Sequence, residues 1–254
     1  MPGTMAQKPR NPIVLIPSRL ASTRLPNKPL ADIHGEPMIA HVWRRGIESG
    51  AGPVVVACGD AEIATAVERA GGRAVLTDPA LPSGSDRIAA ALRQVDPERH
   101  HDAVVCLQGD LPTLAPEAIR TALEPLDDPA VDIGTLATEI RDEDERQAPS
   151  VVKIAIAFTP GRRIARALYF SRTVMPWGEG PHYHHIGLYT YRREALERYV
   201  DLPQGALERR ESLEQLRALE AGMRIDVALV DTLPLGIDTP ADLARAREIL
   251  APRH

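Results

Sequence analysis

The stretch IVLIPSRLASTRLPNKPL, residues 13–30, joins a short apolar run to a long polar loop. Residues 13–17 have the length and the Val, Ile and Leu content of a buried strand. The loop that follows carries three cations, Arg19, Arg24 and Lys28, between hydroxyl side chains and prolines. A guanidinium offers a planar fork of donors and an ammonium a compact charge, and both suit a triphosphate. We therefore expect a phosphate-binding loop directly after the first strand.

Strand-like runs and helical stretches alternate through the first half of the chain. The strand-like runs are residues 13–17, 54–58, 74–76 and 103–108, and a stretch of helical period follows each of them. This alternation predicts an α/β fold with a parallel sheet, whose ligands bind beyond the carboxyl ends of the strands. That position favours phosphate binding over a solvated basic loop. The loop matches neither GxxxxGK[ST] nor GxGxxG, so neither a kinase nor a dinucleotide-binding protein is indicated.

The pattern changes after about residue 130. Longer strands are expected at 132–140 and 151–158 around a charged link. They are followed by the segment ALYFSR at 167–172, a loop rich in Gly, Pro and His, and a strand at 186–192. We interpret residues 131–200 as an inserted antiparallel subdomain that forms a lid or a dimer surface.

The end of the chain returns to helix, strand and helix, at 207–222, 225–230 and 239–250. Thr239 is expected to cap the last helix, with Pro240 at its first position. We expect a single domain over residues 11–254 and a disordered arm or tag at residues 1–10.

The composition limits the class of protein. A hydrophobic content of 44% over 254 residues is enough for a substantial core, and a net charge of −5 gives no general attraction for nucleic acid. No run approaches the ~18 apolar residues of a membrane span, and the first residues lack the apolar core of a secretion signal. Cys58 and Cys106 lie in apolar runs and are expected to be buried free thiols. We expect a cytoplasmic protein that binds neither membrane nor nucleic acid.

Two acids follow predicted strands. Asp110 comes after the fourth strand and Asp238 follows the strand at 225–230. Paired carboxylates together with substrate phosphates are how proteins usually hold Mg²⁺. If the two acids converge, they form a metal site beside the phosphate loop. Each alone is at least as well explained as a helix cap or turn residue.

The histidines include the run HYHH at residues 182–185. Closely spaced histidines allow a transition-metal site, but a solvent-facing Gly/Pro-rich loop is the favoured interpretation of His182 and His184. His185 opens a strand and is the functional candidate of this run.

Several motifs occur together in a fixed order: IPSRLASTRLPNKPL, SGSDR (83–87), LQGDLP (107–112), LYFSR followed by PW, HIGLYTYR, LEQLR and GIDTP. In this combination the chain resembles the 3-deoxy-manno-octulosonate (Kdo) cytidylyltransferases, from about Ile13 to Leu250. The resemblance implies a Rossmann-like nucleotidyltransferase fold, a homodimer, and synthesis of CMP-Kdo from CTP and Kdo for lipopolysaccharide biosynthesis.

The resemblance also implies roles for individual residues. CTP is expected to contact Pro17, Ser18, Arg19, Ser22, Arg24, Lys28, Ser83, Arg87 and Gln108. Mg²⁺ is expected on Asp110 and Asp238, which with Arg19 and Lys28 form the catalytic set. Kdo is expected to contact Tyr169, Arg172, His185, Glu211 and Gln215.

Leu111 is one of several departures from the family pattern, and three alternative functions stand beside the resemblance. The family commonly has Glu where Leu111 stands, so we infer that this carboxylate supports the site without binding the metal. The nearest alternative acceptors are sialic acid, pseudaminic acid and an amino analogue of Kdo. A hexose-1-phosphate transferase normally opens with a Gly-rich loop that is absent here. A non-catalytic nucleotide-binding protein is the alternative from another class.

Overall fold

The computed structural model describes residues 9–21 and 25–252. These residues form two compact units. The N-terminal unit comprises residues 11–120 and the C-terminal residues from 234 onward. The central unit comprises residues 121–233, with residues 9 and 10. The expected insertion at residues 131–200 lies wholly within the central unit.

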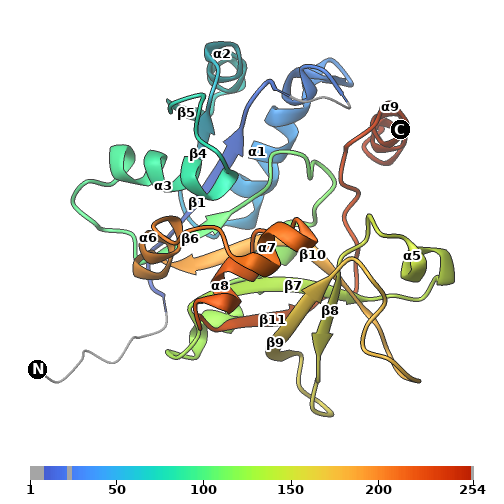
Figure 1. The fold of residues 1–254 in the computed structure, drawn as a ribbon. Coiled ribbons are helices and arrows are strands. Elements are labelled where there is room, and N and C mark those ends of the chain that lie inside the picture. Colours follow the sequence, from blue (N-terminus) through green and yellow to red (C-terminus); the bar gives the residue numbers. More distant parts are fainter. Residues whose placement is uncertain (1–8, 22–24, 253–254) are drawn as a thin grey trace, which may run out of the picture. The chain divides into compact units, whose positions relative to one another are not determined.

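The N-terminal unit contains a parallel sheet in the strand order β5-β4-β1-β6 (Figure 1). Its strands are β1 (Pro12–Ser18), β4 (Val54–Cys58), β5 (Arg73–Leu76) and β6 (Ala103–Cys106). Val14 at the middle of β1 is fully buried and pairs with Val54 on one side and Val105 on the other. The four strand-like runs of the sequence and their parallel arrangement are thus confirmed.

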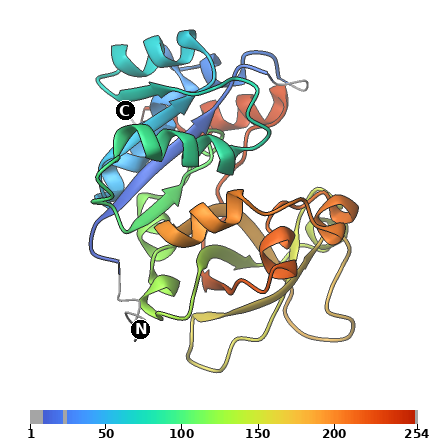
Figure 2. The ribbon, with the colours of Figure 1, turned by 60° about the vertical axis from the view of Figure 1, so that its left-hand side comes forward.

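Helices with an apolar face pack on this sheet. The helices of the unit are α1 (Met38–Ser49), α2 (Ala61–Arg69), α3 (Gly84–Val95), α4 (Pro116–Thr121) and α9 (Pro240–Ile249), with the short helix η1 (Lys28–Leu30) and the hairpin of β2 (Asp32–Ile33) and β3 (Glu36–Pro37). The α9 helix begins as predicted, with Thr239 as the N-cap and Pro240 in the first turn. Apolar side chains of α9 pack with Ile33 and Met38, and α9 (red) accordingly lies beside the N-terminal segment (blue) in both ribbon views (Figure 2).

The carboxyl ends of β1 and β6 approach each other closely at Gly109. A Cβ atom added to Gly109 would lie 2.9 Å from the carbonyl oxygen of Pro17, a separation that real Cβ atoms essentially never show. A glycine is therefore required between Gln108 and Asp110. Its small size places both of these neighbours beside the loop that follows β1.

The central unit contains a mixed sheet in the strand order β10-β7-β11-β9-β8. Its strands are β7 (Ile133–Glu139), β8 (Lys153–Ile156), β9 (Ile164–Ser171), β10 (Tyr183–Arg192) and β11 (Ile225–Leu229). Most neighbouring strands are antiparallel, as expected, whereas β11 runs parallel to β7. A bridge between His184 and Lys153 also joins β10 to β8.

The helices of the central unit differ from the expectation at two places. They are α5 (Glu143–Gln147), α6 (Arg193–Val200), α7 (Ala206–Glu211), α8 (Leu216–Glu220) and the short helix η2 (Glu124–Asp127). The charged link expected between two strands contains α5. The helix expected over 207–222 is broken because Ser212 has a left-handed backbone with φ of 53°, which ends α7.

A buried ion pair joins α7 to α8. The Arg217 guanidinium donates two hydrogen bonds, at 2.9 and 2.7 Å, to the two carboxylate oxygens of Glu208, and it also lies over the Tyr199 ring. Both charged side chains are less than one tenth exposed. Burial alone would raise the pKa of Glu208, but the Arg217 hydrogen bonds outweigh it, and the pKa of Glu208 is lowered.

We predict that Arg217→Met lowers the free energy of unfolding by about 3–5 kcal/mol, because it leaves the Glu208 carboxylate buried without its counter-ion. Urea unfolding followed by circular dichroism measures the loss. The double variant Glu208→Gln/Arg217→Met removes both charges and is expected to recover part of it. Equal stability of the single variant and the wild type would contradict the prediction.

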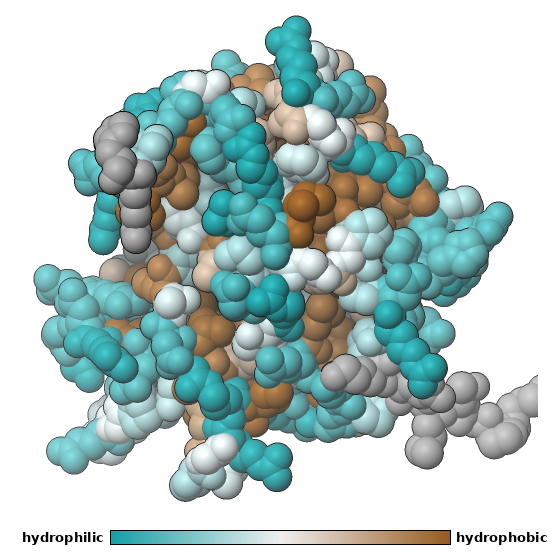
Figure 3. Space-filling model, turned by 180° about the vertical axis from the view of Figure 1, so that it is seen from behind, coloured by the Kyte–Doolittle hydropathy of each residue, from teal (hydrophilic) through white to brown (hydrophobic). Residues whose placement is uncertain are grey.

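Among the described residues, few large apolar side chains are exposed. Hydrophilic residues predominate on the face in Figure 3, with hydrophobic residues visible between them. In the central unit, Trp177 is fully exposed and Leu168 is 64% exposed. No helix in the described part of the chain combines the length and the apolar character that crossing a bilayer requires.

Candidate functional site

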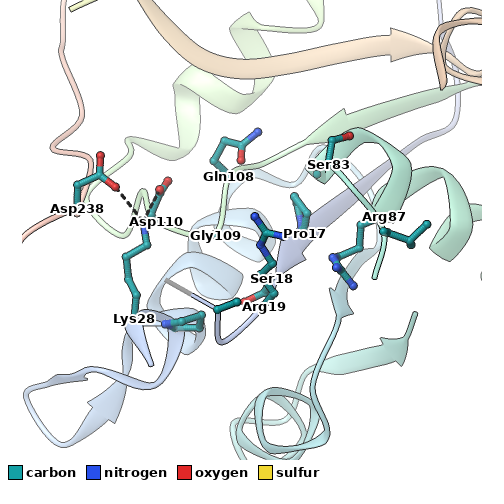
Figure 4. Close-up of a pocket in the computed structure, with 14 residues that line it drawn as sticks. Pro17, Ser18, Arg19, Lys28, Ser83, Arg87, Gln108, Gly109, Asp110 and Asp238 are labelled. Atoms are coloured by element: carbon teal, nitrogen blue, oxygen red, sulfur yellow. Dashed lines mark hydrogen bonds and ion pairs between the residues drawn. The ribbon is translucent and has the colours of Figure 1, made fainter. Parts of the chain in front are cut away.

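A cleft of about 770 Å³ lies at the carboxyl ends of the strands in the N-terminal unit. It is lined by Pro17, Ser18, Arg19, Ala21, Lys28, Pro29, Leu81, Ser83, Gly84, Arg87, Gln108, Gly109, Asp110 and Asp238 (Figure 4). All of the predicted nucleotide and metal residues that the structure describes are among them. Ser22 and Arg24 lie outside the described residues.

Lys28 joins the two predicted metal ligands. Its Nζ donates to Asp110 Oδ2 at 2.8 Å, to Asp238 Oδ1 at 3.2 Å and to the backbone oxygen of Ile237 at 2.9 Å. Burial favours the neutral amine, but the two carboxylates outweigh it and raise the pKa of Lys28. Figure 4 shows the lysine reaching up to both acids. Two carboxylates 128 positions apart therefore converge on one cation.

The chain brings these acids together through backbone contacts of the segment before α9. The amide of Ile237 donates to the backbone oxygen of Asp110 at 3.0 Å, and the amide of Leu235 donates to Thr113 Oγ1 at 2.9 Å. Ile237 is fully buried in the cluster that includes the apolar side of α9. The C-terminal helix thereby fixes Asp238 beside the end of β6.

Two groups at the end of β1 are available to an anion. Ser18 is buried, and its Oγ has no hydrogen-bond partner. Arg19 is exposed, and no hydrogen bond or ion pair engages its guanidinium within residues 9–21 and 25–252. A buried polar atom without a partner is costly, and a bound ligand removes that cost. Both groups therefore fit a phosphate-binding role.

Ser83 and Arg87 are held by their own local bonds. Ser83 caps α3, because its Oγ accepts from the amide of Asp86 at 3.1 Å. The guanidinium of Arg87 donates to Thr77 Oγ1 and to the backbone oxygens of Asp78 and Pro79. Burial, and next the nearby charge of Arg19, lower the pKa of Arg87. Arg87 lines the cleft but also anchors the loop after β5, a role that the sequence did not indicate.

The predicted sugar residues all lie in the central unit. Tyr169 and Arg172 come from the end of β9 and Glu211 from the last turn of α7. Glu211 accepts from Ser171 Oγ at 2.8 Å and from the Arg172 amide at 3.0 Å. Burial, and next the charge of Glu211, raise the pKa of Tyr169. These three predicted residues are therefore brought together.

The Arg172 guanidinium already donates hydrogen bonds within the protein. It donates to the backbone oxygens of Glu211 at 2.9 Å, Pro149 at 3.2 Å and Ser212 at 3.3 Å. Arginine has five N–H donors, so this set of bonds leaves donors for a ligand. Arg172 holds the turn after α7 in addition to any contact with a sugar.

Gln215 and His185 are both buried. The Gln215 amide nitrogen has no hydrogen-bond partner, which makes it a donor that a ligand oxygen would satisfy. His185 Nε2 lies 3.0 Å from Thr135 Oγ1. Burial, and next the neighbouring His184, lower the pKa of His185 to about 3, so its imidazole is neutral at pH 7.

The solvent-facing loop expected for His182 and His184 is wrong. His182 is buried and its Nε2 lies 3.1 Å from the backbone oxygen of Pro176. His184 lies within β10, and its Nδ1 is 2.6 Å from a Glu145 carboxylate oxygen of α5. The carboxylate comes from the segment that the sequence indicated only as a charged link. The two cysteines, in contrast, are buried free thiols as predicted.

The acidic side chains of the cleft offer few ligands for a divalent ion. Among the described residues, no group of three or more His, Cys, Asp or Glu side chains could hold a metal. Asp110 and Asp238 nevertheless share one cation, because the Lys28 ammonium stands between their oxygens. Mg²⁺ typically takes one or two carboxylates and completes its shell with phosphates and water, so the two acids fit a metal that arrives with a triphosphate.

Known proteins are similar to this chain along most of its length. Residues 13–225 match the cytidylyltransferase family model. The 3-deoxy-manno-octulosonate cytidylyltransferase of Paramagnetospirillum magneticum is 64% identical over 94% of this chain and 97% of its own length. That of Rhodospirillum centenum is also 64% identical, over 98% of this chain and 97% of its own.

A solved structure matches as well. It is a CMP:2-keto-3-deoxy-manno-octonic acid synthetase complexed with CTP, with a TM-score of 0.86 and 37% identity, covering 95% of this chain and 99% of that one. The chain belongs to the 3-deoxy-manno-octulosonate cytidylyltransferase family.

Proposed function

We propose that the protein transfers CMP from CTP to Kdo, forming CMP-Kdo and pyrophosphate for lipopolysaccharide biosynthesis. The observation that carries the proposal is the convergence of Lys28, Asp110 and Asp238 in the cleft at the carboxyl ends of the sheet. The similar solved structure is described as a complex with CTP, which supports the choice of nucleotide. Because CTP is a cytoplasmic nucleotide, we place the reaction in the cytoplasm.

Different residues of the cleft contribute to different parts of the reaction. The anomeric hydroxyl of the sugar attacks the α-phosphorus in line, and a new P–O bond forms as the bond from the α-phosphorus to the bridging oxygen of the β-phosphate breaks. Pyrophosphate leaves, the hydroxyl proton passes to water, and no covalent enzyme intermediate forms. Arg19 and Lys28 neutralise charge on the phosphates, and the buried hydroxyl of Ser18 donates to them. Asp110 and Asp238 would hold Mg²⁺, which when bound offsets the charge that develops on the α-phosphate. Catalysis then rests on positioning and charge.

A separate group of cleft residues is proposed to contact the base and the ribose of CTP. We assign Ser83, Arg87 and Gln108 to this part of the cleft, with Pro17 as its apolar wall. Arg87 contributes by holding the loop after β5 in place, and the amide of Gln108 supplies both a donor and an acceptor. Ser22 and Arg24 complete the phosphate loop in this proposal.

The acceptor set is Tyr169, Arg172, His185, Glu211 and Gln215. Its chemistry suits an acidic polyhydroxylated sugar: a guanidinium for the carboxylate, and for hydroxyl groups a carboxylate, an amide and a phenol. The unpartnered amide nitrogen of Gln215 supports this assignment.

We predict that Arg172→Met raises the KM for Kdo about tenfold and leaves the KM for CTP nearly unchanged, since one charge-assisted hydrogen bond is lost on the acceptor side. Arg163→Met is the matched control, because Arg163 is an exposed arginine that also donates to a backbone oxygen, that of Leu229. Steady-state pyrophosphate release measures both constants. A rise in the KM for CTP alone would reject the assignment.

The assembly is also part of the proposal. We propose a homodimer in which the expected insertion, residues 131–200, supplies the interface or a lid. The exposure of Trp177 and Leu168 supports it, because large apolar side chains are seldom left in water without a partner.

Pyrophosphate release tests the function as a whole. CTP and UTP are each offered with Kdo, an amino analogue of Kdo, N-acetylneuraminate, pseudaminic acid and glucose-1-phosphate. The proposed function requires release with CTP and Kdo at the highest kcat/KM. Preference for another acidic sugar selects a sister cytidylyltransferase, and CTP binding without release selects a non-catalytic nucleotide-binding protein.

A further inference from the structure

Strand β10 contains an irregularity between Ile186 and Tyr189, close to His185. Ile186 lies opposite Leu136 of β7, and Tyr189 lies opposite the adjacent Thr135, so two extra residues of β10 intervene. A β-bulge of this kind leaves backbone groups without their usual ladder partners. Carbonyl oxygens of the bulge, beside His185, therefore need hydrogen-bond donors from outside the strand ladder.

The side chain of Thr135 provides a hydrogen-bond donor at the bulge. Thr135 is fully buried, and its Oγ1 lies 2.8 Å from the Leu188 oxygen and 3.3 Å from the Ile186 oxygen. The same Oγ1 lies 3.0 Å from Nε2 of His185. The Thr135 hydroxyl thus lies within hydrogen-bonding distance of both the bulge carbonyls and the His185 imidazole.

The hydrogen-bond count fixes the imidazole tautomer. A hydroxyl has one proton to donate, and carbonyl oxygens can only accept. The Thr135 proton is therefore directed to a bulge carbonyl, with Leu188 the nearest, and a lone pair faces His185. Two acceptors facing each other would repel, so Nε2 of His185 must carry a proton and donate it to Thr135.

Packing holds the ring in this orientation. The ring centroid of His185 is 5.0 Å from that of Phe170 in an edge-on arrangement and 5.3 Å from that of Tyr189. The depressed pKa keeps the imidazole neutral, so the second nitrogen, Nδ1, carries no proton. In the described part of the chain no hydrogen bond engages Nδ1, which leaves it as an acceptor.

We propose that Thr135 is a positioning residue that fixes His185 as the Nε2–H tautomer, so that Nδ1 accepts a hydrogen bond from a hydroxyl group of the acceptor sugar. The inference rests on the proposed function, in which His185 contacts the sugar. A lone pair at Nδ1 selects a hydroxyl and rejects a carboxylate oxygen. The carboxylate of the sugar is thereby left to a cationic side chain.

The test compares Thr135→Val, which removes the hydroxyl at nearly constant shape, with Thr135→Ser, which keeps it. Thr190→Val is the matched control, because Thr190 is also fully buried in β10 and donates to a backbone oxygen, that of Ala122, away from His185. Long-range ¹H–¹⁵N spectra of ¹⁵N-histidine protein without substrate report the His185 tautomer. Pyrophosphate release with varied Kdo and varied CTP reports the two KM values.

The wild type, Thr135→Ser and Thr190→Val are expected to show the Nε2–H tautomer, and Thr135→Val a mixed or Nδ1–H population. Thr135→Val is expected to raise the KM for Kdo about tenfold with little change for CTP, and Thr135→Ser to restore it. An Nδ1–H tautomer in the wild type would overturn the inference. An equal rise in the KM for Kdo in Thr135→Val and Thr190→Val would also overturn the inference.

The spectra need no substrate, so failure of the proposed function can be distinguished from failure of the proposed role of Thr135. A wild type that shows the Nε2–H tautomer but releases no pyrophosphate from CTP and Kdo rejects the proposed function, and the sugar contact with it. A wild type that is active but shows the other tautomer rejects only the role of Thr135.

Discussion

Asp110→Asn is expected to lower pyrophosphate release from CTP and Kdo by about 10³-fold, because a well-placed charge at the reacting phosphate contributes several kcal/mol and each 1.36 kcal/mol is a factor of ten. Asparagine keeps the shape of the side chain but removes the negative charge that Lys28 contacts at 2.8 Å. In the proposed site, the divalent ion would then lose one of its two protein ligands. Steady-state kinetics across a Mg²⁺ series measure the loss.

Asp102→Asn is the matched control for this variant. Asp102 precedes the same strand, β6, at its opposite end, and its carboxylate accepts a hydrogen bond from the amide of Asn11. We expect Asp102→Asn to keep nearly full activity. If Asp110→Asn is folded and as active as this control, Asp110 does not hold the metal.

The N-terminal unit could be predicted from the sequence because its signals are local. A run such as IVLIP has strand length and composition, and the repeated order of strand and helix restricts the sheet to a parallel arrangement. The carboxyl-end rule then places Arg19 and Asp110 at one edge without any knowledge of their contacts. The structure puts both of them in one cleft.

The position of Asp238 was predicted less directly. Nothing local in GIDTP distinguishes a metal ligand from a turn residue. The pairing with Asp110 depends on the Ile237 amide and on the packing of α9, which are contacts between segments more than 100 residues apart. The strand ends raised the pairing of the two acids only as a condition, and the family resemblance made it an expectation.

The central unit was harder to predict because its elements depend on tertiary contacts. The left-handed backbone of Ser212 breaks a segment whose composition is helical throughout. His182 is buried although it lies in a Gly/Pro-rich segment. Thr135 occupies an ordinary strand position, and its significance arises from a bulge on the neighbouring strand. No sequence signal marks any of these three.

Leu111 shows how a departure from the family pattern is accommodated. Its side chain is buried, and a Cβ added to Gly236 would lie 3.8 Å from it. An apolar residue at this position packs beneath the segment that carries Asp238. The inference that a carboxylate at this position would support the site without binding the metal stays a prediction.

Lys28→Met is expected to lower turnover by about 10²–10³-fold, because in the proposed function it removes a cation that neutralises the phosphates. The same variant is informative without substrate. In the wild type the Lys28 ammonium lies between Asp110 and Asp238 and offsets their charges. Methionine fills similar space but leaves two carboxylates facing each other, so we expect a lower thermal midpoint in the absence of divalent ions.

Mg²⁺ should then restore part of the thermal midpoint of Lys28→Met, since an ion that binds only the folded state stabilises it by mass action. The wild type should respond less, because its own ammonium competes for the same oxygens. Arg247→Met, which removes one exposed positive charge from α9 where Arg247 donates to the backbone oxygen of Asp32, should behave as the wild type. If Mg²⁺ raises the midpoint of all three proteins equally, the carboxylate pair is not the ion's site in the free protein, and the assignment of Asp110 and Asp238 would have to rest on the nucleotide-bound state alone.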